Sequence, residues 1–81
     1  MTAAQFDKLS LNEKGGIVFS DSKYLAVRKY YGFTVNLYLF NDFYIEVFYH
    51  PVLNKIDRIE VLEDLGKLDL YIDYMNKLNL K

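Results

Sequence analysis

Cysteine and tryptophan are absent from this sequence, and proline and histidine each occur once. Without cysteine the chain can form no disulfide and offers no thiolate to a metal ion, so a reducing compartment is permitted. No apolar run approaches the ~18 residues that span a membrane. The first ten residues, MTAAQFDKLS, lack the basic and apolar regions of a signal peptide. We therefore expect a cytoplasmic protein with no membrane partner.

Aromatic residues are abundant, with eight Tyr and six Phe among 81 residues. The chain is 52% hydrophobic and 26% charged, which is typical of a globular protein, and its length predicts a single domain over residues 1–81. So small a core cannot enclose every ring, so some rings should lie at the surface or in an interface. The net charge of −1 indicates no general attraction to nucleic acid or to an anionic membrane.

Residues 33–50 predict a β-hairpin, because polar and apolar side chains alternate in both arms. The odd-numbered positions, which we expect on the core face, are Phe33, Val35, Leu37, Leu39, Phe43, Ile45, Val47 and Tyr49. A two-residue loop at Asn41-Asp42 would pair Leu37 with Glu46 and place the glutamate in the core, which is costly unless the carboxylate is paired. A three-residue loop over residues 40–42 pairs Leu37 with Ile45 instead. The sequence therefore predicts the three-residue loop, with Glu46 on the opposite face.

A helix is predicted over residues 11–19, because Ser10 and Glu13 have the spacing of a capping box. Gly15-Gly16 weakens this helix, and two explanations stay open. The pair allows close packing on the sheet, or it forms a phosphate-binding loop, although no glycine-rich phosphate motif surrounds it. Residues 1–8 show only weak periodicity.

Two further strands and a second helix complete the prediction. Residues 24–31 form a strand, and a three-residue connection through Gly32 pairs Arg28 with Asn36. His50-Pro51 ends the hairpin, Asn54-Lys55 forms a turn, and residues 56–62 form a weaker, polar edge strand. Acidic residues at positions 63 and 64 favour a helix start, and this helix runs to about residue 77. Its sheet-facing residues are predicted to be Leu65, Leu68, Ile72 and Met75.

The order of these elements indicates an α+β fold. We expect a two-layer sandwich, in which an antiparallel meander of three to four strands is covered on one face by an N-terminal and a C-terminal helix. The other face of the sheet would then be open.

Three segments carry a resemblance to known sequences. They are Leu25-Ala26-Val27-Arg28, Val35-Asn36-Leu37-Tyr38 and Ile45-Glu46-Val47-Phe48-Tyr49. With the early helix, this pattern resembles a group of short bacterial proteins of unknown function. The resemblance covers about residues 11–70 and implies the helix, antiparallel sheet and helix order, but no activity.

No group of residues predicts catalysis or a cofactor. The chain has one histidine beside a proline, and no base is recognisable beside a serine or threonine. The acidic residues Asp57, Glu60, Glu63 and Asp64 lack the spacing of a calcium loop and indicate a solvated strand edge and helix start.

One candidate interaction face follows from the two predicted registers. It combines the row Arg28, Asn36 and Glu46 with the rings Tyr38, Tyr44 and Phe48. Tyrosine and arginine are enriched at binding hot spots. A polar row can also simply order a half-exposed sheet.

The sequence therefore predicts a small non-enzymatic domain that binds a protein partner or a second copy of itself through this face. An alternative is single-stranded nucleic-acid binding by stacking on Tyr38, Tyr44 and Phe48, which the net charge and Glu46 oppose. A small enzyme with no identifiable catalytic group is the third hypothesis.

Overall fold

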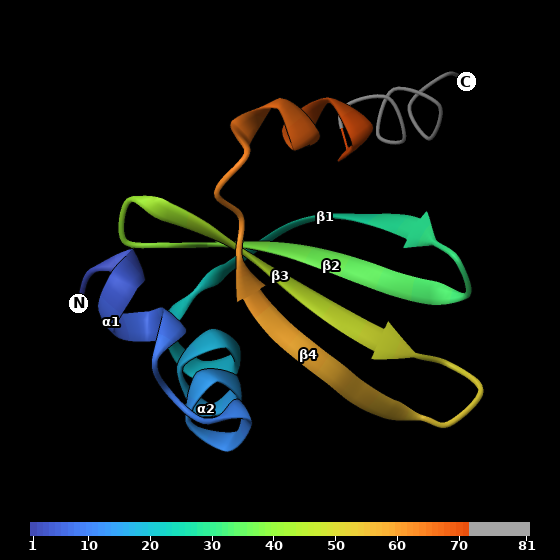
Figure 1. Ribbon diagram of the computed structural model, residues 1–81, viewed down its shortest axis with the longest axis horizontal. Coiled ribbons are helices and arrows are strands. Elements are labelled where there is room, and N and C mark those ends of the chain that lie inside the picture. The colour runs from blue at the N-terminus through green and yellow to red at the C-terminus, as the bar shows by residue number, and fades with distance from the viewer. Residues whose placement is uncertain (72–81) are drawn as a thin grey trace.

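The computed structural model describes residues 1–71 (Figure 1). Its helices are α1 (Ala3–Asp7) and α2 (Leu11–Asp21), and its strands are β1 (Lys23–Tyr30), β2 (Phe33–Phe40), β3 (Phe43–His50) and β4 (Lys55–Val61). The strands form one antiparallel sheet in the order β1-β2-β3-β4. A 3₁₀ helix, η1 (Leu65–Lys67), and α-helical residues 68–71 follow. The predicted α+β class and antiparallel meander are therefore confirmed.

Both N-terminal helices begin with a capping box. At α2 the Glu13 backbone N–H donates to Ser10 Oγ at 3.2 Å, and the Ser10 N–H donates to Glu13 Oε1 at 2.9 Å, as predicted. At α1, Thr2 and Gln5 make the same pair of bonds at 3.1 and 2.8 Å. The sequence prediction did not include α1, although Thr2 and Gln5 have the spacing of this motif. A helix of one and a half turns has too little apolar periodicity to be recognised by its pattern.

The hairpin of β2 and β3 has a two-residue turn at Asn41-Asp42, so the predicted three-residue loop is wrong. Asn41 adopts φ 55°, in the left-handed region that asparagine tolerates. Leu37 consequently lies opposite Glu46, and Ile45 lies opposite Tyr38. The free-energy cost of burying the Glu46 carboxylate argued against this register. It is offset because the carboxylate has two hydrogen-bond partners, which are described below.

The hairpin of β1 and β2 also has a two-residue turn. Its residues Tyr31 and Gly32 have φ of 44° and 87°, and positive φ at both central positions matches the twist of the flanking strands. Arg28 therefore lies opposite Val35 and not opposite the predicted Asn36. A β-bulge shifts the register once more near the start of β1.

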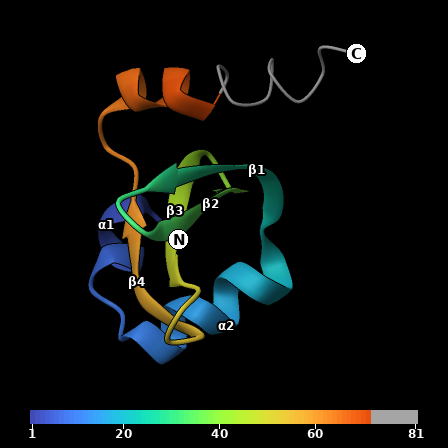
Figure 2. The same cartoon turned by 90° about the vertical axis from the view of Figure 1, so that its right-hand side faces the viewer.

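The sheet carries an apolar cluster on each face, and different parts of the chain cover the two (Figures 1 and 2). Helices α1 and α2 cover the N-terminal face, and residues 62–71, the C-terminal segment, cover the C-terminal face. The N-terminal face holds Phe6, Val18, Phe43, Ile45, Val47 and Ile59. The C-terminal face holds Ala26, Val35, Leu37, Phe48, Leu62 and Tyr71.

This arrangement corrects the prediction that an N-terminal and a C-terminal helix cover the same face. With Leu37 opposite Glu46, the odd-numbered residues of β2 share a face with the even-numbered residues of β3. The apolar odd-numbered residues of β3 therefore turn to the other face. Because both faces are then apolar, each needs a cover of its own, and the sheet becomes the middle layer of three.

Within the C-terminal segment, η1 begins at an Asp64 cap, whose Oδ1 accepts from the Gly66 backbone N–H at 3.0 Å. Leu68 packs against the C-terminal face, as predicted. Leu65 was expected there too, but 60% of its surface is exposed. Ile72 and Met75 lie outside the described residues. Tyr71 is buried in this cluster although the helical spacing did not select it.

Gly15 and Gly16 lie in the middle of α2 and form no loop, so the phosphate-binding explanation is wrong. A Cβ built on Gly15 would make contacts of 3.8 Å or more, to Phe19 and Ile59, and one on Gly16 would meet nothing within 4 Å. Close packing therefore does not require glycine at either position.

We expect Gly16→Ala to raise the free energy of unfolding by about 1 kcal/mol, because alanine has the higher helix propensity. Gly32→Ala is the control at a position where φ is 87°. It should lower the free energy of unfolding by about 1–2 kcal/mol. Urea denaturation measures both values. A destabilised Gly16→Ala variant would contradict a helical conformation at this residue.

Candidate functional site

The six residues of the predicted interaction face do not share one face. Tyr38 packs with the N-terminal-face cluster, and Asn36, two positions along β2, is on the same side. The other four are on the C-terminal face, and they are Arg28, Tyr44, Glu46 and Phe48. The C-terminal segment packs on this second group. The row Arg28–Asn36–Glu46 is therefore not formed, and the two charged residues meet directly instead.

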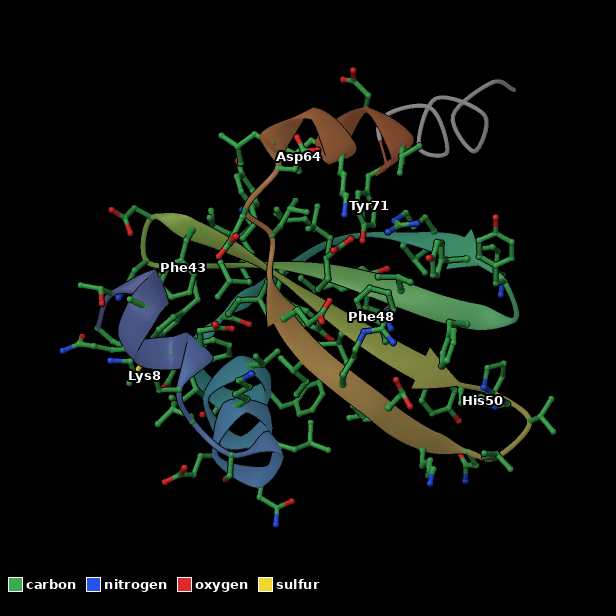
Figure 3. The ribbon with its side chains drawn as sticks, in the orientation of Figure 1. Lys8, Phe43, Phe48, His50, Asp64 and Tyr71 are labelled. Atoms are coloured by element: carbon green, nitrogen blue, oxygen red, sulfur yellow. The ribbon has the colours of Figure 1, made fainter. Side chains whose placement is uncertain are left out.

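Glu46 is the centre of a buried polar network. Only 4% of its surface is exposed. Its Oε2 accepts a hydrogen bond from Arg28 Nη2 at 3.1 Å and another from the Tyr71 hydroxyl at 2.6 Å. Figure 3 shows Tyr71 pointing from the C-terminal segment toward the sheet. The network thus joins β1, β3 and the C-terminal segment.

Aromatic rings complete the surroundings of the Arg28 guanidinium. Its Cζ lies 5.2 Å from the centre of the Tyr30 ring and 5.3 Å from that of Tyr71. Burial raises the pKa of the Tyr71 phenol above its ordinary value of 10.0, and the hydrogen bond to Glu46 raises it further. Tyr71 is therefore a protonated donor near neutral pH. The arrangement suits a structural ion pair that holds the C-terminal segment on the sheet.

The three rings proposed for base stacking are used in packing. Phe48 is buried, and Arg58 Cζ lies 3.9 Å from its ring centre. Tyr38 makes edge contacts with Phe19 and Tyr24, at ring separations of 6.0 and 5.5 Å. Tyr44 packs against the C-terminal-face cluster. They lie on both sides of the sheet, so they do not form a common platform for nucleic-acid bases.

A polar cavity of about 370 Å³ lies beside the start of the C-terminal segment. Its lining residues are Asp7, Glu46, Glu60, Val61, Leu62, Glu63, Asp64 and Lys67. Within residues 1–71, no three or more His, Cys, Asp or Glu side chains are grouped so that they could hold a metal ion. This cavity therefore gathers negative charge on one part of the molecule without forming a metal centre.

The β1–β2 and β3–β4 turns lie at the same end of the sheet (Figures 1 and 2). Both turns carry exposed apolar side chains. The exposed fractions are 90% for Tyr31, 84% for Val52 and 59% for Leu53. Between the turns, the rings of Phe33 and His50 lie 5.3 Å apart and link them. We call residues 29–34 and 49–56 the two-turn tip.

Local hydrogen bonds order the β3–β4 turn of this tip. The Leu53 backbone N–H donates to His50 Nδ1 at 3.2 Å, and the Tyr49 hydroxyl bonds to Asn54 Oδ1. Asn54 itself adopts φ 54°. The turn therefore presents Val52 and Leu53 to solvent from a defined backbone.

The charges of the two-turn tip are all of one sign. Its two segments contain Lys29 and Lys55 and no aspartate or glutamate. On β1 and β2, Lys29 Nζ donates to Thr34 Oγ1 at 3.2 Å. The sequence prediction did not identify this tip. A signal was present, because Val52 and Leu53 are apolar residues directly after the strand-ending His50-Pro51, where turns are usually polar.

No family model, curated protein or solved structure matches this chain. The resemblance to a group of short bacterial proteins therefore stays a prediction. Among residues 1–71, no helix is long and apolar enough to cross a membrane. The geometry defines a class, an α+β domain whose four-stranded sheet is covered on both faces and ends in an exposed apolar tip.

Glu46→Ala should lower the free energy of unfolding by about 3–5 kcal/mol, because Arg28 would keep a buried charge without its partner. Glu60→Ala is the matched control, since its side chain is 51% exposed in its ion pair with Arg58. This control should change stability by less than about 1 kcal/mol. Chemical denaturation measures both, and equal effects would refute the special role of Glu46.

Stability should fall as the pH rises above about 10. The folded state holds the Tyr71 proton more tightly than the unfolded state, so this contribution is complete below the unfolded pKa and is lost above it. Tyr71→Phe should cost about 1–3 kcal/mol near neutral pH, because Glu46 loses a donor. Tyr71→Phe should also make the fall in the free energy of unfolding at alkaline pH smaller.

Some alkaline decline should remain in Tyr71→Phe, because burial and the nearby Tyr24 also raise the pKa of Tyr38. Tyr31→Phe is the control, since this ring is exposed. Unfolding free energies measured between neutral pH and pH ~11 should decline in the control as in the wild type. A parallel decline in Tyr71→Phe would contradict the proposed hydrogen bond.

Proposed function

We propose that this protein is a small non-enzymatic interaction domain that binds its partner through the two-turn tip. The observation that carries the proposal is the joint exposure of Tyr31, Val52 and Leu53 at one end of the sheet. Apolar area left in water is unfavourable by about 25 cal/mol per Å². Gathered exposed apolar side chains are typical of interaction surfaces. The two clusters on the sheet faces form without these residues, so they are not needed for the core.

The polar groups of the described residues favour structural over catalytic roles. Glu46, Arg28 and Tyr71 bond to one another within the fold. His50 accepts a backbone hydrogen bond in its turn and packs against Phe33. These contacts support a binding module rather than an enzyme.

Charge favours a partner other than a second copy of the chain. A two-fold contact presents the same surface from both subunits. At the two-turn tip it would bring Lys29 and Lys55 of one copy toward the same lysines of the other. Like charges placed together oppose such an interface, whereas an anionic partner would be attracted.

Site-specific photo-crosslinking tests this proposal. The photoreactive residue p-benzoylphenylalanine replaces Leu53 in the test variant and Leu65 in the control variant. The two leucines are 59% and 60% exposed, so the probes are equally accessible. After irradiation in cells that naturally produce the protein, we expect adducts from position 53 and not from position 65.

A second set of cells carries Val52→Ser together with a photoreactive residue at position 53. Loss of the adduct would show that the apolar side chain contributes to binding. Circular dichroism of the purified variants checks the fold. Equal labelling from positions 53 and 65, or no adduct from either, would refute the two-turn tip as the binding surface.

A further inference from the structure

The net charge of −1 hides an uneven distribution of charges over the molecule. Residues 29–34 and 49–56 contain no acidic residue, whereas Asp7, Glu60, Glu63 and Asp64 line one cavity elsewhere. Figure 3 shows Asp64 and His50, which mark these two regions, well apart. The two-turn tip is therefore locally cationic on a weakly anionic protein.

Along the strands, the two lysines lie behind the apolar apex. Lys29 precedes Tyr31 by two residues, and Lys55 follows Leu53 by two. Residues 31–32 and 51–54 are turns, so Lys29 near the end of β1 and Lys55 at the start of β4 lie in the strands just behind the apex. Elements that lie in a membrane interface bury their apolar side by about 5–10 Å. The order of an apolar apex followed by lysines therefore suits shallow apolar insertion with the lysines nearer the headgroups.

We infer that the two-turn tip docks on the surface of an anionic lipid bilayer, which differs from the sequence-based prediction of no membrane partner. Val52 and Leu53 enter the boundary of the acyl chains, and the Tyr31 ring lies at the headgroup level, where tyrosine is enriched. Lys29 and Lys55 approach the lipid phosphates and carboxylates. The inference rests on the proposed function and names the class of its partner.

Two observations favour a bilayer over other anionic partners. Of the three apolar side chains that carry the proposal, only Tyr31 has a ring on which a nucleic-acid base could stack, whereas Val52 and Leu53 are aliphatic. The turns also project from the end of the sheet (Figures 1 and 2). A projecting apolar tip needs a matching hollow in a protein partner, whereas a fluid bilayer accommodates it without one.

Co-sedimentation with lipid vesicles tests the inference. The probes are vesicles of phosphatidylcholine alone and vesicles of phosphatidylcholine rich in phosphatidylserine. Wild-type protein should pellet with the anionic vesicles and not with the neutral ones. High salt should release part of it, because the lysine contribution is screened.

Matched variants separate the apolar from the charged contribution. Val52→Ser/Leu53→Ser should lower the partition coefficient at least about tenfold, since apolar burial is lost. Lys55→Gln should lower it about fivefold. The controls are Leu65→Ser, at an equally exposed leucine, and Lys8→Gln, at an exposed lysine outside the tip. Both controls should bind as the wild type does.

The outcomes distinguish this inference from the proposed function. The lipid inference is overturned if the wild-type protein stays in the supernatant with anionic vesicles. It is also overturned if Val52→Ser/Leu53→Ser and Lys55→Gln pellet with these vesicles to the same extent as the wild type. If position 53 then still crosslinks to a protein or a nucleic acid, the two-turn tip remains a binding surface for that class of partner. Failure of both experiments overturns both proposals.

Discussion

The hydrogen bonds of the buried Glu46 carboxylate determine how this small sheet is assembled. A carboxylate that is 4% exposed is tolerated only when it is paired. Its partners come from β1, through Arg28, and from the C-terminal segment, through Tyr71. The central hairpin, an outer strand and the C-terminal cover thus depend on one side chain. A slip of one residue in the hairpin would turn Glu46 to the N-terminal face and separate it from both partners.

The same register explains where the many aromatic residues go. Because the apolar sides of β2 and β3 face opposite ways, the sheet has two apolar clusters and encloses more rings than one core could. Phe6 and Phe43 pack on the N-terminal face, and Phe48 and Tyr71 pack on the C-terminal face. Most rings of the predicted open aromatic face are therefore packed in or against one of the two apolar clusters. The rings that remain most exposed are Phe19, Tyr24 and Tyr31, and Tyr31 in the β1–β2 turn leads them with 90% of its surface exposed.

The residues that stabilise the fold and the residues of the proposed binding surface are separated in space as a result. The Glu46 network holds the C-terminal segment on the sheet through Tyr71. The two-turn tip is built from turns at the end of the strands (Figure 1). Substitutions at Val52 or Leu53 remove no contact within either cluster. The acidic cavity lies on another part of the molecule, so positive and negative charges are unevenly distributed over the protein. Such an asymmetry would orient it toward an anionic surface.

The sequence by itself determined the local elements. Ser10 and Glu13 predicted the start of α2, alternation predicted β2 and β3, and Gly32 and Asn41-Asp42 predicted the positions of the turns. These signals act over a few residues, so they are readable without a fold. The same signals could also have revealed α1, through Thr2 and Gln5.

Only the tertiary structure decided the register, the covered faces and the location of the exposed tip. Alternation has a period of two, so a two-residue and a three-residue loop differ only in which residues of β3 share a face with those of β2. The energy that decides between them comes from Arg28, 18 positions from Glu46, and from Tyr71, 25 positions from it. A local pattern cannot contain such partners, because they come together only when the chain has folded.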